Sequence, residues 1–141
     1  MTNVKEVWRD DDFDEMGWHD SRLYELSFPD EEFQIKFDID YIFKWEKSSG
    51  SITGFWVSPC DLIFENVAYF CVDIDFKNNT LIFISEIKRT NKRSTPNGRL
   101  VEWDYEMECD NGLIRFSSTG FKQRIRKQPI LSESQDLGKP R

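Results

Sequence analysis

The longest alternation of apolar and polar residues constrains the fold of this chain more than any other feature. From residue 33 to residue 43 every second position is apolar, namely Phe33, Ile35, Phe37, Ile39, Tyr41 and Phe43. Successive side chains of a β-strand point to opposite faces of a sheet, so this pattern predicts a strand with one buried face. Alternation of this length is typical of antiparallel sheets, in which the second face meets water.

A second alternation covers residues 101–109. Its apolar members are Val101, Trp103, Tyr105, Met107 and Cys109, and the positions between them form an acidic row of Glu102, Asp104, Glu106 and Glu108. Asn111-Gly112 follows and strongly favours a two-residue hairpin turn. We therefore predict a hairpin in which Glu108 lies opposite Arg115, with the acidic row on the outer face.

Shorter apolar runs predict further strands at 24–28, 54–57, 62–64, 70–76, 81–87 and 121–127. Asn78-Asn79 predicts a tight hairpin that pairs 70–76 with 81–87. Ser58-Pro59 is expected to interrupt its strand, because proline cannot donate to a sheet ladder. Lys88–Arg99 carries basic residues and ends in turn-forming ones, so we expect a long exposed loop there.

These patterns predict a mainly β protein, with an α+β protein as the alternative. We expect about seven or eight antiparallel strands in a curved sheet or a sandwich, with at most one or two short helices. The 141 residues are enough for a single domain with a buried core. Residues 1–17 are expected to form an acidic leader and residues 132–141 a frayed tail, since neither has much to bury.

Composition indicates where such a chain would work. No apolar run approaches the roughly 20 residues that a bilayer-spanning helix needs. Residues 1–6 lack the apolar segment of a secretory signal, so we expect a cytoplasmic protein with no membrane contact. Cys60, Cys71 and Cys109 are odd in number and widely spaced, which favours free thiols over disulfides.

The residues that catalysis would need are scarce. His19 is the one histidine, and the chain has no G-x-S-x-G motif, no phosphate-binding loop and no metal-ligand spacing. We interpret Trp18-His19-Asp20 as structural: Trp18 closes one end of the core, His19 satisfies backbone groups, and Asp20 turns the chain. On a strand, His19 and Asp20 would point to opposite faces and could not form a dyad. The sequence thus predicts neither an enzyme nor a cofactor or metal site.

Charge favours a macromolecular partner. The net charge is −7, which attracts basic partners and repels nucleic acid. The candidate contact residues are the acidic row Glu102, Asp104, Glu106 and Glu108, the leader residues Asp10, Asp11, Asp12, Asp14 and Glu15, and the strand pair Asp38 and Asp40. The alternative is a domain that binds single-stranded nucleic acid through the basic loop 88–99 and the strand 122–127.

Several motifs resemble a family of small bacterial proteins that open with a Trp-His-Asp signature. The motifs are Trp18–Tyr24, the alternating strand Phe33–Trp45, Val57-Ser58-Pro59 with Leu62–Val67, and Ser118–Phe121 with Gln123 and Arg126. The resemblance covers roughly residues 17–137. Members are often encoded beside polymorphic or contact-dependent growth inhibition toxins.

The resemblance implies an immunity protein, which is a cytosolic inhibitor that binds and neutralises one toxin domain encoded nearby. It carries no functional residue over to this chain, because immunity interfaces differ from member to member. Many such toxins are nucleases with basic clefts, toward which an acidic inhibitor is steered electrostatically.

Overall fold

Ten strands form one open antiparallel sheet in the computed structural model, which describes residues 1–141. The strands are β1 (Val7–Arg9), β2 (Ser21–Ser27), β3 (Ile35–Ser48), β4 (Ser51–Glu65), β5 (Ala68–Ile74), β6 (Ile82–Ser94), β7 (Val101–Cys109), β8 (Gly112–Ser118), β9 (Gly120–Ile125) and β10 (Ile130–Ser132). Their order in the sheet is β1-β9-β4-β3-β2-β6-β7-β8-β5, and β10 pairs with β4. One short 3₁₀ helix, η1 (Asp10–Glu15), follows β1.

This architecture confirms the prediction of a mainly β protein with a curved antiparallel sheet. The strand count exceeds the prediction because β1 and β10 are three residues long, too short to show an alternation. The η1 helix is the only helix, and no helix of the structure could cross a membrane.

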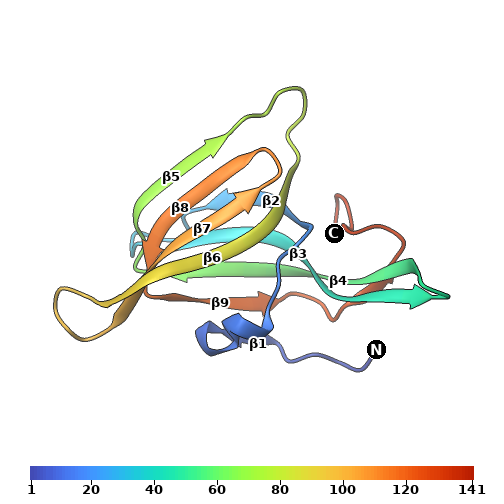
Figure 1. Cartoon of the computed structure of the whole chain (residues 1–141), viewed down its shortest axis with the longest axis horizontal. Coiled ribbons are helices and arrows are strands. Elements are labelled where there is room, and N and C mark those ends of the chain that lie inside the picture. Colours follow the sequence, from blue (N-terminus) through green and yellow to red (C-terminus); the bar gives the residue numbers. More distant parts are fainter.

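The sheet bends sharply at β2. This strand pairs with β3 along most of its length, but with β6 only over Ser21–Leu23. The strands β6, β7, β8 and β5 therefore rise as one leaf from the layer of β3, β4 and β9 (Figure 1). A bend of this kind lets the inner faces of the two parts pack on each other and bury one core.

Aromatic rings from both predicted alternations meet in that core. Phe37 and Phe64 come from the layer, whereas Tyr105 and Phe116 come from the leaf. The ring of Phe64 lies 4.7 Å from that of Phe116 and 4.9 Å from that of Tyr105, both edge to face. Such contacts are favourable beyond the apolar area that they bury.

Strand β4 corrects the prediction that Ser58-Pro59 interrupts it. Pro59 lies in mid-strand and is fully buried opposite Asp40 of β3. Its carbonyl accepts a hydrogen bond from the Arg126 amide, in the link between β9 and β10. The backbone nitrogen and carbonyl of a strand residue point to the same side. The nitrogen of Pro59, which carries no hydrogen, therefore points toward the link between β9 and β10, and no β3–β4 hydrogen bond is lost.

The predicted Asn78-Asn79 hairpin is wrong. Strand β5 pairs with β8, and β6 pairs with β2 and β7, so β5 and β6 are not neighbours. Residues 75–81 connect them past the turn between β7 and β8, where the Asp75 amide donates to the Asn111 carbonyl. Asparagine pairs favour a turn locally but do not determine which strands the turn joins.

Two further predictions are corrected in the leaf. Residues 88–94, expected in a loop, continue β6, so the loop between β6 and β7 covers only residues 95–100. The hairpin of β7 and β8 is present, but Cys109 lies opposite Gly112, so the turn residues are Asp110 and Asn111. Arg115 therefore lies opposite Glu106 and not Glu108, two residues from the predicted register.

Both chain ends are more ordered than predicted. In the leader, β1 pairs with β9, and Phe13 of η1 packs against Trp18, Tyr105 and Phe121. The expected frayed tail, residues 132–141, begins in β10 and then crosses the outer face of β2 and β3, where side chains of those strands bind it.

Candidate protein-binding surface

The predicted acidic row lies on the outer face of β7, between two strands that carry bases. Lys88 Nζ of β6 lies 3.2 Å from Glu108, and Arg93 lies 3.1 Å from Glu102 and 3.0 Å from Asp104. Hydrogen bonds from Asn91 and Arg93 lower the pKa of Asp104. The row is therefore partly neutralised within the protein, which the sequence did not indicate because β6 was expected to end before these bases.

The leader carboxylates lie on the opposite side of β7 from the row. Asp10 accepts hydrogen bonds from Arg89 (2.7 Å) and from the hydroxyl of Tyr105 (3.2 Å), whose ring belongs to the core. Asp12 pairs with Lys5 at 2.7 Å, and that hydrogen bond lowers its pKa. Asp11, Asp14 and Glu15 remain exposed on η1. The structure thus does not bring the two predicted acidic sites together.

Trp18, His19 and Asp20 lie where the chain passes from the leader into β2. Trp18 is buried, and its indole N–H donates to Oε1 of the buried Gln123 at 2.8 Å. His19 is exposed, with Nδ1 3.2 Å from the carbonyl oxygen of Ser85. Asp20 has a φ of +66° and turns the chain into β2. In this turn His19 Nε2 lies 3.4 Å from Asp20, so the expectation that the two cannot meet is wrong.

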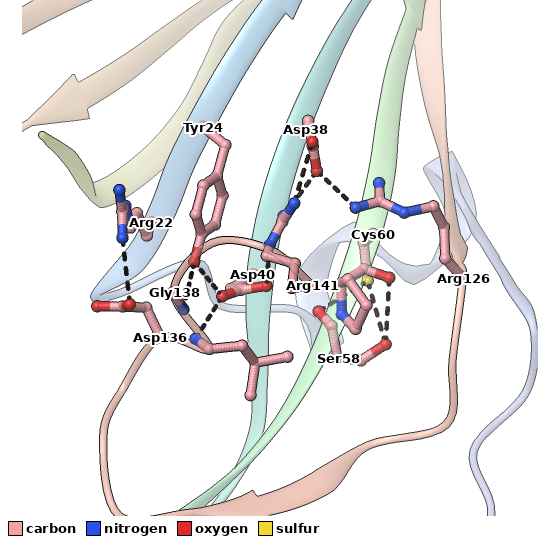
Figure 2. Close-up of polar contacts among 12 residues, drawn as sticks. Arg22, Tyr24, Asp38, Asp40, Ser58, Cys60, Arg126, Asp136, Gly138 and Arg141 are labelled. Atoms are coloured by element: carbon pink, nitrogen blue, oxygen red, sulfur yellow. Dashed lines mark hydrogen bonds and ion pairs between the residues drawn. The ribbon is translucent and has the colours of Figure 1, made fainter. Parts of the chain in front are cut away.

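The pair Asp38 and Asp40 is covered by the tail (Figure 2). Asp40 is fully buried and accepts hydrogen bonds from the Tyr24 hydroxyl (2.6 Å), the Leu137 amide (2.7 Å) and Arg141 Nε (2.9 Å). The Arg141 guanidinium also lies 2.6 Å from Asp38 and 3.5 Å from the centre of the Tyr24 ring.

This enclosed network affects ionisation. Burial raises the pKa of Tyr24, and its hydrogen bond to Asp40 adds to that effect. Burial alone would raise the pKa of Asp38, but hydrogen bonds from Arg141 and Arg126 outweigh it and hold that pKa below its usual value. Both carboxylates are thus occupied by bases and donors of the same chain, which removes them from the candidate contact residues.

A surface that the sequence did not predict lies where β2 ends and β5 begins. Its apolar members are Phe28, Phe33 and Tyr69, which are 67%, 74% and 89% exposed. Together with Val67 and Phe70 they line a groove of about 310 Å³, which we name the aromatic groove. A solvent-exposed cluster of large aromatic side chains is typical of an interaction site, whereas single exposed apolar residues are common on any protein surface.

Strained backbone holds two of these rings outward. Phe33 has a φ of +62° and Tyr69 a φ of +54°, a region that bulky residues rarely occupy. The Phe33 carbonyl accepts a hydrogen bond from the Val67 amide at 2.8 Å, and a bulge between Ala68 and Cys71 includes Tyr69. Such strain costs about 1–3 kcal/mol per residue and clusters at functional sites. Bulges likewise re-aim side chains beside such sites.

An acidic rim of three residues, Asp30, Glu31 and Glu32, borders the aromatic groove. Asp30 and Glu31 line it directly, all three are exposed, and none is in an ion pair. Tyr69 also lines a second depression with Asp104 and Glu106, so the groove continues onto the acidic row. A desolvated aromatic centre with a charged rim is the usual anatomy of a protein interface.

The basic residues of the nucleic-acid alternative are dispersed. Lys88 and Arg93 pair with the acidic row, and Arg126 pairs with Asp38 and Asp61. Lys122 and Arg124 lie on β9, which β4, β3 and β2 separate from β6 in the sheet.

Comparison of the chain with protein-family models, with curated proteins and with solved structures gave no match. The geometry of the aromatic groove is therefore the main structural guide to function.

Proposed function

We propose that this chain is a protein-binding module whose contact surface is the aromatic groove with its acidic rim. In line with the family resemblance, the proposed partner is a basic toxin domain encoded beside the chain, which the chain would bind and neutralise as an immunity protein. The main support for this proposal is that the side chains of Phe33 and Tyr69 are exposed to solvent and that both residues have a positive φ.

Charge supports a basic partner at this place. The rim carboxylates have no internal base, unlike the acidic row and the pair Asp38 and Asp40. An unpaired anionic rim attracts a cationic protein and speeds its encounter, while buried aromatic anchors provide most of the affinity.

Replacement of Tyr69 by serine is expected to weaken binding of the neighbouring toxin domain at least about tenfold, because an aromatic anchor is lost. Calorimetric titration of the purified pair measures the effect. Leu131→Ser is the matched control, since Leu131 is also exposed (57%) but lies on β10. Equal affinity of all three proteins would rule out the groove, and a toxin domain that binds none of them would rule out the immunity function.

Reversal of the rim charges tests the electrostatic part. Changing Asp30, Glu31 and Glu32 to lysine is expected to slow association about tenfold or more at low ionic strength, with a smaller difference at high salt. Stopped-flow mixing at two salt concentrations measures this. The same reversal of Glu102, Asp104 and Glu106 should slow association less, since neighbouring bases already offset that row. Identical rates for both variants would contradict a role for the rim.

A further inference from the structure

One edge of the sheet is open beside the aromatic groove. Strand β5 is seven residues long and pairs only with β8, so its other side has no neighbour (Figure 1). The opposite edge, β1, has only three residues. Ala68, Tyr69 and Phe70 of β5 line the groove, so the open edge begins at the proposed contact surface.

The pairing with β8 determines which backbone groups of β5 are free. The Asp75 amide donates to the Asn111 carbonyl, and the Asp73 carbonyl points at β8, where a Cβ on Gly112 would lie only 2.0 Å from it. Backbone groups alternate in direction along a strand, so the N–H and C=O groups of Val72 and Ile74 point away from β8. No loop backbone group hydrogen-bonds to them.

This edge has little of the usual protection against strand pairing. Exposed edges are commonly blocked by proline, by lysine or by a covering element. Strand β5 contains neither proline nor lysine, and its one charged residue is Asp73. Its bulge lies at the start of the strand, between Ala68 and Cys71, so Val72–Ile74 remains regular.

We propose that a basic, extended segment of a protein partner adds to β5 as a further strand, with main-chain hydrogen bonds to Val72 and Ile74. An apolar side chain of that segment enters the aromatic groove, and its lysine or arginine side chains meet the acidic rim. Strand addition gives affinity through the main chain and specificity through side-chain pockets. The inference rests on the proposed function, because it takes the groove as the contact surface.

Charge favours this occupant over a second copy of the chain. Antiparallel pairing of two β5 edges about Asp73 would place the two Asp73 carboxylates directly across from each other. Like charges across a strand pair are destabilising, and the net charge of −7 adds to the repulsion. A lysine-containing segment reverses the sign of each of these contributions.

The test uses a blocked peptide that alternates lysine with valine and carries one phenylalanine, titrated to about 1 mM into the ¹⁵N-labelled chain. We expect the Val72 and Ile74 amide resonances to shift downfield and to gain protection from hydrogen exchange. Val72→Pro should abolish these changes, because it removes an outward N–H without breaking a β8 bond. Val72→Thr keeps that N–H and should bind as the wild type does.

Each outcome bears on the proposal. A peptide that is N-methylated at alternate residues lacks N–H donors along one edge and should not bind. A peptide in which glutamate replaces lysine should bind at least about tenfold more weakly. Unchanged Val72 and Ile74 resonances, or equal binding by Val72→Pro, would overturn strand addition. A loss of toxin binding in Tyr69→Ser would then still support the groove as the contact surface, so the two proposals fail separately. Dimerisation of the chain through β5 would also overturn the choice of occupant.

Discussion

Replacement of Trp18 by alanine is expected to lower the free energy of unfolding by about 3–5 kcal/mol, the range for a large aromatic removed from a core. Trp18 is 3% exposed, and its ring contacts those of Phe13, Tyr41 and Phe121. Its indole also satisfies Gln123, whose amide nitrogen already lacks a partner. The alanine variant thus leaves both a cavity and a buried amide with no hydrogen bond.

Chemical denaturation followed by the remaining tryptophans measures this loss. Trp18→Phe separates the two contributions, since it keeps most of the ring but removes the donor, and should cost about 1–3 kcal/mol. His19→Ala is the adjacent control. The His19 side chain is 69% exposed, so its loss should change stability by less than about 0.5 kcal/mol. Equal effects at both positions would contradict the assignment of Trp18 alone to the core.

Gly112→Ala is expected to destabilise the chain by about 3 kcal/mol, at the upper end for overpacked sites. The added Cβ would lie 2.0 Å from the Asp73 carbonyl oxygen and 2.9 Å from the Ile74 Cα, so β5 would have to separate from β8. Both obstacles are backbone atoms, which cannot move aside as the end of a flexible side chain can.

Hydrogen exchange measures where that destabilisation falls. In Gly112→Ala, the β8-facing amides Cys71 and Asp73 should lose protection well before those of β3 and β4. Gly98→Ala is the matched control, because that glycine also has a positive φ (+70°), but a Cβ added there would meet no atom within 4 Å. Uniform loss of protection across the sheet would indicate a general loss of stability in place of a local release of β5.

Local alternation was sufficient to predict the strands that build the core. Ile35, Phe37, Ile39 and Tyr41 are buried as their spacing predicts, and Tyr105 and Met107 face them from β7. The hairpin after β7 was also predictable, because turn residues act on their immediate neighbours, but its turn lies one residue earlier than predicted and its register differs by two residues. What the pattern could not give is strand order, since β5 pairs with β8 across more than thirty residues that include two other strands.

The candidate site was harder to predict for a different reason. Because Phe28 and Phe33 are apolar, sequence reasoning places them in the core, whereas both are exposed. The positive φ of Phe33 and Tyr69 cannot be recognised from a single sequence. One signal was present: two phenylalanines flank a proline and three acids in residues 28–33, which places aromatics in a polar turn. The acidic row was overrated as a contact surface because its charge was summed along one strand. The bases that offset this charge lie on the neighbouring strand β6.

The position of β5 also determines the sequence of events in folding. Its only neighbour, β8, follows it in the chain by about forty residues, so β5 leaves the ribosome long before its partner exists. The β7–β8 hairpin closes locally, while the docking of β5 requires a large loop to close and is therefore slower. The strand with the open edge is thus completed after the hairpin that supports it. The strand addition proposed above would therefore require a chain in which β5 has already docked on β8.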